Sequence, residues 1–249
     1  MNAIINTQHK HRSYRSYSSK AIEEEKLNAI ISAAQSAPSW INGQQVSIIA
    51  VADEQRKSRL SELVGNQAYV AQAPIFFIFC ADFYRAQIAG EKHGKTLEAI
   101  DDVDALLVGA TDVGLAMSNA ITAAESLDLG TVPIGGIRKN PLEVIELLNL
   151  PKYVIPISGL CIGYPNENPG TKPRFPQEAI LHKETYQHNQ TSIIDTYDNT
   201  MSAYMNERTK GRQSTSWTER VSSFYEKPYY SSIADMLEQQ GFKCKNVKK

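Results

Sequence analysis

Along residues 23–35, the apolar positions recur with the spacing of one helix face. Leu27, Ile30, Ile31 and Ala34 stand at i, i+3, i+4 and i+7. Three glutamates at 23–25 precede this pattern, where negative charge favours the start of a helix, and Pro38 follows it. The pattern therefore predicts a helix over about residues 23–35.

Three continuous apolar runs predict strands. VSIIAVA (46–52) and IFFIFCA (75–81) are rich in Val, Ile and Phe, a composition typical of strands buried on both faces. YVIPISGLCIGYP (153–165) predicts a third buried strand. Between the first two runs, EQRKSRLSELVG predicts a helix that ends at Gly65.

The longest helical pattern covers residues 97–129. Its many glycines and alanines allow close packing on several sides, as a central buried helix requires. Asp112 and Asn119 interrupt its most apolar part, which favours a buried helix over a membrane span. TVPIGG (131–136) then predicts a short strand that enters a glycine turn, and Asn-Pro at 140–141 predicts the N-cap and first residue of another helix.

The character of the chain changes after Pro165. Residues 165–181 contain four prolines and no helical period, which predicts an ordered loop or an arm. Residues 190–240 are polar and mostly helical, and Gly241 is suited to cap the final helix. We therefore predict a core of residues 1–165 and an extension of residues 166–249 that wraps a neighbouring surface.

The overall charge excludes several kinds of partner. Of the 249 residues, 42% are hydrophobic and 21% are charged, and the formal net charge is −1. Such a balance gives no general attraction to nucleic acid or to an acidic membrane, so any anion site must be local. The N-terminal stretch lacks the apolar segment of a secretory signal, which favours a cytoplasmic location.

Several motifs with known chemistry are absent or incomplete. GEKHGKT (90–96) has three residues between its glycines where a phosphate-binding P-loop needs four. The sequence contains neither GxGxxG nor GxSxG, which argues against a dinucleotide-binding Rossmann domain and a serine hydrolase. The three cysteines lie far apart and no His or carboxylate set has ligand spacing, so neither a disulfide framework nor a metal site is predicted.

Two short cationic segments are candidates for an anion site. HRSYRSYS (11–18) places Arg12 and Arg15 beside serine hydroxyls, and an arginine fork matches a phosphate group. TKPRFP (171–176) places Lys172 and Arg174 on one side of a proline-stiffened, extended segment. Alone, each segment is typical of a solvated surface. Together, in a nearly neutral protein, they also fit one shared phosphate.

Three polar or glycine-rich stretches lie beside the apolar runs. PIGGIR (133–138) lets backbone N–H groups approach a planar ligand closely, although an ordinary tight turn explains it equally well. APSWINGQQ (37–45) and GNQAYV (65–70) supply amides and hydroxyls that suit the edge of a heteroaromatic ring, and they suit caps and turns equally well.

Taken in order, these segments resemble the nitroreductase family of FMN-binding oxidoreductases. The similarity is carried by HRSxRxY, AAQSAPS, GxQxYVxxAPxFxxFCADxxR, AAESLxLGTVxIGGxRxNP, LPxYVxPxxGLCxGYPxxxP and KPRxPxxAxxHxExY, and it spans about residues 9–186. Within the family it resembles the branch that contains the NADPH-dependent, oxygen-insensitive nitroreductases and flavin reductase P. RTxGR…TSW at 208–217 extends the likeness.

The resemblance implies an α+β flavoprotein fold, in which helices flank a central sheet around a long buried helix. It also implies an intertwined homodimer with two FMN sites at the interface, each protomer's C-terminal arm embracing its partner. For the phosphate and ribityl chain of FMN it implies His11, Arg12, Ser13, Arg15, Lys172 and Arg174. Near the flavin ring it implies Gln67 with Pro133, Ile134, Gly135 and Gly136. It also implies that Ser39 and Asn42 approach the flavin from the partner subunit.

The activity implied is a ping-pong reduction. NADPH, with NADH as a possible donor, passes hydride to FMN, and two electrons then go to a nitroaromatic, a quinone or free flavin. The cofactor carries this chemistry, so no catalytic side chain is expected. The resemblance implies Arg208, Lys210 and Arg212 for the extra phosphate of NADPH, although a solvated turn also explains them.

Two residues depart from the family pattern. Trp40 stands where relatives often have a small serine, and we expect it to line the substrate pocket. Pro133 occupies a position that is aromatic in some relatives. The alternatives left open are a specialised reductase of one physiological substrate, a carrier that delivers reduced FMN to a partner enzyme, and a phosphate-binding protein without flavin.

Overall fold

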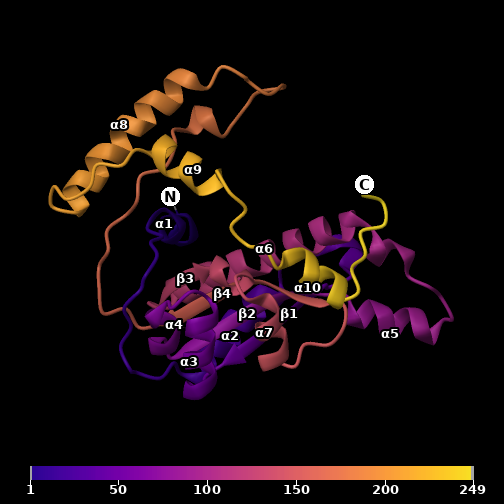
Figure 1. The fold of residues 1–249 in the computed structure, drawn as a ribbon. Coiled ribbons are helices and arrows are strands. Elements are labelled where there is room, and N and C mark those ends of the chain that lie inside the picture. Colours follow the sequence, from indigo (N-terminus) through magenta and orange to yellow (C-terminus); the bar gives the residue numbers. More distant parts are fainter. Residues whose placement is uncertain (1, 248–249) are drawn as a thin grey trace. The chain divides into compact units, whose positions relative to one another are not determined.

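A computed structural model describes residues 2–247 of the protein, which form two compact units. Unit 1 contains the described residues up to Pro169 together with those from Tyr230 onward, and unit 2 is Gly170–Tyr229 (Figure 1). The chain thus leaves unit 1, forms unit 2 and returns.

A four-stranded antiparallel sheet forms the centre of unit 1, with the order β1-β2-β4-β3. The strands are β1 Val46–Val51, β2 Ile75–Asp82, β3 Gly130–Ile134 and β4 Val154–Gly163. β2 is buried along its whole length, as its sequence predicts. The prediction that β1 is buried on both faces is wrong, because β1 is an edge strand and most of its residues are only half-buried.

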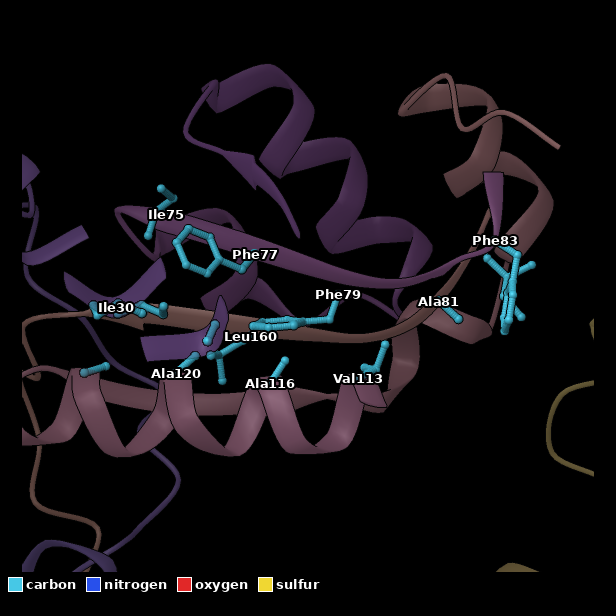
Figure 2. Close-up of a cluster of buried hydrophobic side chains, with 14 of the residues drawn as sticks. Ile30, Ile75, Phe77, Phe79, Ala81, Phe83, Val113, Ala116, Ala120 and Leu160 are labelled. Carbon is cyan, nitrogen blue, oxygen red and sulfur yellow. The ribbon is translucent and has the colours of Figure 1, made fainter. Parts of the chain in front are cut away.

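Helices cover both faces of this sheet. On one face, α6 (Val103–Ser126) and α2 (Glu24–Gln35) pack against Phe77, Phe79 and Leu160 (Figure 2). On the other face, α3 (Glu54–Leu63), α4 (Ala68–Gln72) and α7 (Pro141–Leu147) pack against a cluster that includes Phe76 and Ile78. These phenylalanines are fully buried, and each contributes about 1.5–3 kcal/mol relative to an exposed side chain.

The long helix α6 is shorter at its start than its sequence pattern predicts. Asp102 caps it by accepting a hydrogen bond of 2.8 Å from the backbone N–H of Asp104, so residues 98–101 form a separate 3₁₀ turn. Ala116 and Ala120 are buried against the sheet (Figure 2). Among the described residues, α6 alone has the length and apolar composition of a membrane span, a property that core helices of soluble proteins share.

One side of α6 carries an apolar stripe that unit 1 does not cover. Leu107 and Leu115 are exposed, and a Cβ at Gly114 would have no neighbour within 4 Å. Between Asp104 and Ser126, which are also exposed, the exposed residues follow the spacing of one helix face: Leu107, Ala110, Thr111, Gly114, Leu115 and Ser118. The expectation of a helix surrounded on several sides therefore holds only for its inner face within one chain.

The remaining helices of unit 1 include α1 (Ala3–His9), α5 (Tyr84–Lys92) and α10 (Ile233–Gln239). After α10, Gly241 adopts a φ of +93° and Phe242 packs edge-on against Phe83 and Tyr153. Lys245 then pairs with Asp101 at 2.5 Å. The division at residue 165 expected from the sequence groups these last residues with the extension, whereas in the structure they pack within unit 1.

Unit 2 consists of an irregular arm followed by α8 (Thr191–Arg208) and α9 (Trp217–Tyr225). The carboxylate of Asp198 on α8 accepts a hydrogen bond of 2.9 Å from the backbone N–H of Thr218 on α9. Hydrogen bonds from Thr218 lower the pKa of Asp198 below its ordinary value. The two helices are therefore joined by a side-chain contact as well as by the loop between them.

Candidate functional site

The cationic segment 11–18 is held along the edge strand β3. The backbone N–H of Tyr14 donates to the carbonyl of Thr131 at 3.0 Å, and Ser13 forms a bridge with the same residue. Further on, Tyr17 is buried, and its hydroxyl donates to the carbonyl of Tyr14 at 2.7 Å. Burial raises the pKa of Tyr17 well above its ordinary value. The segment thus has a fixed backbone path beside the sheet.

Both arginines of this segment keep donors for a ligand. Arg12 donates from Nε to the carbonyl of Lys10 at 3.1 Å and from Nη1 to the side chain of Asn168. Arg15 is exposed, and its Nη1 makes a long contact of 3.4 Å with the carbonyl of Ser13. Because a guanidinium has five N–H donors, both side chains can bind an anion in addition to these contacts.

The glycine turn after β3 lies beside the loop that joins α3 and α4. A Cβ at Gly136 would stand 2.4 Å from the carbonyl oxygen of Val64 and 2.7 Å from Nε2 of Gln67. Gln67 Nε2 donates to that same carbonyl at 2.8 Å. A Cβ at Gly135, by contrast, would have no neighbour within 4 Å. Packing therefore explains the glycine at 136, whereas open space lies in front of Gly135.

Gln67 connects the glycine turn to the cationic segment. The hydroxyl of Tyr69 donates to Oε1 of Gln67, and the guanidinium of Arg15 lies 5.9 Å from the centre of the Tyr69 ring. Pro133 is half-buried, and the side chain of Ile134 is 1% exposed within the core. Ile134 therefore has only its backbone to offer a ligand.

The polar loop that contains Ser39, Trp40 and Asn42 lies at the other edge of the sheet, just before β1. Trp40 donates its backbone N–H to the buried carboxylate of Asp112 at 3.2 Å, and Ser39 Oγ accepts from the backbone N–H of Gln44 at 3.1 Å. Trp40 is 62% exposed. Several residues here have a positive φ, including the β-branched Ile41 at +49°, a conformation such side chains rarely adopt.

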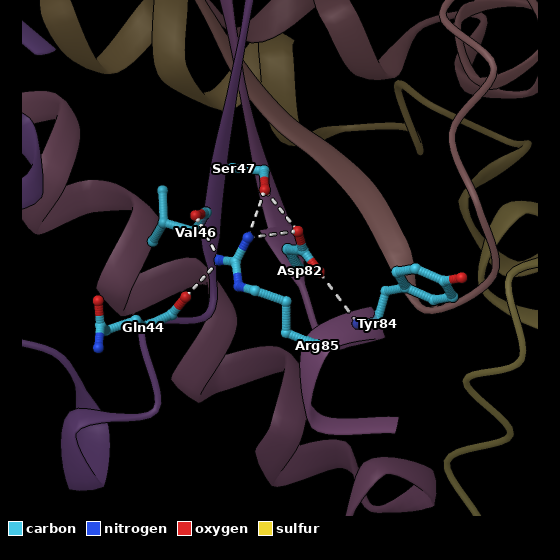
Figure 3. Close-up of polar contacts among 6 residues, drawn as sticks. All are labelled: Gln44, Val46, Ser47, Asp82, Tyr84 and Arg85. Carbon is cyan, nitrogen blue, oxygen red and sulfur yellow. Dashed lines mark hydrogen bonds and ion pairs between the residues drawn. The ribbon is translucent and has the colours of Figure 1, made fainter. Parts of the chain in front are cut away.

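Arg85 anchors the end of this loop (Figure 3). Its Nη2 donates to the carbonyls of Gln44 at 2.6 Å and Val46 at 2.8 Å, and its Nη1 donates to Asp82 at 3.1 Å. Ser47 bonds to both Asp82 and Arg85. A cavity of about 750 Å³ adjoins this loop, with Ser39, Gln44, Arg85 and Asp112 among its lining residues. The motif GxQxYVxxAPxFxxFCADxxR includes Arg85, but the sequence interpretation gave this arginine no role.

The Trp40 loop and the cationic segment 11–18 lie far apart within one chain. The Trp40 loop contacts α6 at Asp112, whereas the cationic segment contacts α6 at Glu125. At 1.5 Å per residue, these two positions are roughly 20 Å apart along the helix. Ser39 and Asn42 therefore lie at one edge of the sheet, while Arg15 and Gly135 lie at the other.

Unit 2 holds the second predicted cationic segment. Arg174 donates from Nη1 to the carbonyl of Lys172 at 3.0 Å, and both residues are exposed. Phe175 stacks on Tyr197 of α8 with ring centres 3.9 Å apart, and the Tyr197 hydroxyl donates to the carbonyl of Pro173 at 2.9 Å. The segment is thus anchored on α8 while its two cations remain at the surface.

The third predicted group of cations lies at the end of α8. Arg208 donates to the hydroxyl of Tyr204 at 2.8 Å, and Arg212 donates from Nε to the carbonyl of Thr209 at 3.0 Å. Lys210 has a φ of +54° and is exposed like both arginines. The structure therefore gathers Arg208, Lys210 and Arg212 in one turn.

Together, these features define an α+β protein with a cationic segment, a glycine turn and a glutamine side chain at one edge of its sheet. The sequence matches the model of the nitroreductase family over residues 9–164, and the model of the nitroreductase family's C-terminal domain over residues 172–245. The chain belongs to the nitroreductase family. This result confirms the resemblance and the fold class inferred from the sequence.

Individual relatives agree with this assignment. The chain is 53% identical over 246 residues to a Bacillus subtilis (strain 168) protein named FMN reductase (NAD(P)H), with 98% of this chain and 99% of that protein covered. It is 38% identical over 233 residues to the oxygen-insensitive NADPH nitroreductase of Salmonella typhimurium, covering 93% and 95%. The solved structure of B. megaterium NfrA2 superposes with a TM-score of 0.96 at 53% identity, covering 98% and 99%.

Proposed function

We propose that this protein is an NAD(P)H-dependent oxidoreductase that binds FMN and reduces nitroaromatics, quinones or free flavin. The observation that carries the proposal is the docking of the Arg12–Arg15 segment on β3, next to the open space at Gly135. An anionic group and a planar ring joined to it would both find partners there. The names of the relatives, an FMN reductase and an NADPH nitroreductase, support the same activity.

The residues present fit FMN. The guanidinium groups of Arg12 and Arg15 suit a phosphate, and Ser13 adds a hydroxyl donor. A planar ring can lie against Gly135 because no Cβ intervenes, and the nearby Gln67 amide supplies polar groups for a ring edge. When bound, FMN supplies the capacity to accept a hydride and to pass on two electrons.

The chain's own contribution is binding and orientation. The β3 edge holds the backbone that carries Arg15, and the Gln67 side chain is fixed by its bond to Val64, so this backbone and this amide are in place before a ligand arrives. His11 is positioned next to Arg12 in the same segment. We assign Lys172 and Arg174 of unit 2 to the same phosphate, which their exposed, anchored cations support.

The proposal includes a homodimer, because part of the flavin site comes from a partner subunit. Ser39, Trp40 and Asn42 lie at the sheet edge opposite the cationic segment, so they reach a flavin only if it belongs to a partner subunit. The uncovered stripe of Leu107, Gly114 and Leu115 on α6 supports an interface between two copies. In such a dimer, Trp40 lines the acceptor pocket and unit 2 embraces the partner.

The cations at the end of α8 are our candidates for the extra phosphate of NADPH. Arg208, Lys210 and Arg212 share one exposed turn, which supports recognition of a dianionic group. We place the protein in the cytoplasm, where reduced nicotinamide cofactors are available.

The direct test is to purify the protein, record its flavin spectrum and titrate the apoprotein with FMN. Arg15→Ala should weaken FMN binding by about 10–100-fold, because a hydrogen bond to a charged group contributes about 1.5–3 kcal/mol. The matched control is Arg59→Ala, which removes an exposed arginine paired with Glu62. A protein that stays colourless with FMN would refute the proposal, and a flavin that neither NADPH nor NADH bleaches anaerobically would exclude the reductase.

A further inference from the structure

A largely buried carboxylate lies directly behind the cationic segment. Glu125, in the last turn of α6, accepts a hydrogen bond of 2.8 Å from the Thr131 hydroxyl on β3. The same oxygen, Oε1, lies 2.7 Å from Nδ1 of His11. The Glu125 side chain is only 9% exposed and Thr131 is fully buried, whereas the His11 side chain is 27% exposed. The three residues come from three different elements.

The position of this carboxylate is electrostatically unfavourable by itself. The C-terminal end of a helix carries partial negative charge, and burial removes water from the carboxylate. Glu125 is therefore stable there only with hydrogen-bond donors, and His11 and Thr131 provide them. The quoted motif AAESLxLGTVxIGGxRxNP contains Glu125 but gives it no role, and the FMN contacts proposed above do not use it.

The contact determines which nitrogen of His11 carries a proton. A carboxylate can only accept, so Nδ1 must donate to it in either protonation state of the imidazole. Nε2, on the opposite side of the ring, is then directed away from Glu125. It offers a lone pair when the ring is neutral and an N–H donor when the ring is an imidazolium. The backbone carbonyl of Thr131 also accepts a hydrogen bond from the backbone N–H of Tyr14. Thr131 therefore holds the carboxylate with its side chain and the cationic segment with its backbone.

We propose that Glu125 is a positioning residue that fixes the tautomer and ring orientation of His11. His11 Nε2 then faces the phosphate bound by Arg12, Ser13 and Arg15, and it donates a hydrogen bond to that phosphate when the ring is an imidazolium. This inference rests on the proposed FMN site only for the identity of the ligand. The tautomer itself is a property of the free protein.

The tautomer can be measured in the apoprotein by long-range ¹H–¹⁵N NMR at a pH where histidine is neutral. His11→Ala identifies the His11 signals among the five histidines. We expect Nδ1–H for His11 in the natural sequence and in Glu125→Gln, whose amide oxygen still accepts, and loss of this preference in Glu125→Leu. An Nε2–H tautomer in the natural sequence would overturn the proposal, whether or not the protein binds FMN.

The functional consequence is tested by comparing FMN with riboflavin, which lacks the phosphate. Glu125→Leu should weaken FMN binding about tenfold or more and leave riboflavin binding within about twofold, since one charge-assisted hydrogen bond is affected. In a His11→Ala background, Glu125→Leu should cause no further loss of FMN affinity. Equal losses for both ligands, or additive losses in the double variant, would show that Glu125 is merely structural.

If Glu125→Leu does not fold, two other measurements still test the proposal. The tautomer in the natural sequence needs no variant at position 125, and His11→Ala alone should weaken FMN binding without affecting riboflavin. Failure of the natural sequence to bind FMN would refute the proposed function and leave the tautomer result standing.

Discussion

The glycine turn offers a prediction in which two adjacent substitutions should behave differently. In Gly136→Ala, the new methyl group would lie 2.4 Å from the Val64 carbonyl oxygen and 2.7 Å from Gln67 Nε2. The first of these atoms is backbone at the end of α3, so it cannot move without displacing the loop. In Gly135→Ala, the methyl group would have no neighbour within 4 Å.

The expected energies differ in sign. Overpacking of this kind costs about 1–3 kcal/mol, and an alanine recovers about 0.4–1 kcal/mol by restricting the unfolded chain. Gly136→Ala should therefore destabilise the protein by about 1–2 kcal/mol, or about 2–8 °C in Tm for a chain of this size. Gly135→Ala should be neutral or slightly stabilising, because neither glycine has a positive φ.

The assay is thermal unfolding of both flavin-free variants by circular dichroism, followed by titration with FMN. Gly136→Ala should unfold earlier than the natural protein, whereas Gly135→Ala should keep its Tm and bind FMN more weakly because its methyl group occupies the ring's space. A Gly136→Ala variant with unchanged Tm would refute the packing argument. Undiminished FMN affinity in Gly135→Ala would instead show that the flavin does not lie against Gly135.

Two further predictions concern the NADPH clamp and the C-terminal tail. Arg208→Ala should raise the KM for NADPH at least about tenfold and leave that for NADH nearly unchanged, since only NADPH carries the extra phosphate; equal changes in steady-state assays would exclude the clamp. The hydrogen bond from Lys245 lowers the pKa of Asp101, and the same pair raises the pKa of Lys245. The pair's stabilisation is therefore present above the ordinary pKa of an aspartate and is lost as the pH falls through the lowered value. Asp101→Asn should lower Tm at pH 7, and this difference should vanish as the pH falls below the lowered pKa of Asp101; a difference that stays constant on acidification would contradict the ion-pair origin.

Local patterns were sufficient for most elements of unit 1. The helices at Glu24–Gln35, Glu54–Leu63 and Pro141–Leu147 were predictable because caps and apolar spacing act over a few residues. The start of α6 was not, because the apolar period continues through 98–101 while the Asp102 cap interrupts it. The exposure of β1 was also missed, because it depends on the order of strands in the sheet.

Only part of the proposed site could be named from the sequence. Arginine pairs and glycine turns have recognisable chemistry in a short stretch, so Arg12, Arg15 and Gly135 could be singled out from the sequence. Glu125 and Arg85 stand in motifs of the family resemblance, but their roles could not be inferred there. Those roles depend on partners far away in the chain, 114 residues away in the case of His11 and Glu125. Within a helical pattern, each looks like an ordinary charged surface residue.

The return of the chain to unit 1 after Tyr230 means that unit 2 is tethered at both ends. A truncation after residue 165 would remove α10 as well as unit 2, and would strip Phe242 from Phe83 and Lys245 from Asp101. Any defect of such a truncated protein would therefore reflect a damaged core of unit 1 as well as the loss of unit 2. Excising residues 170–229 and joining the cut ends with a short flexible linker keeps these contacts and isolates what unit 2 contributes. Since a double tether also limits how far unit 2 can travel, any embrace of a partner must be made by a loop with both ends anchored and not by a free tail.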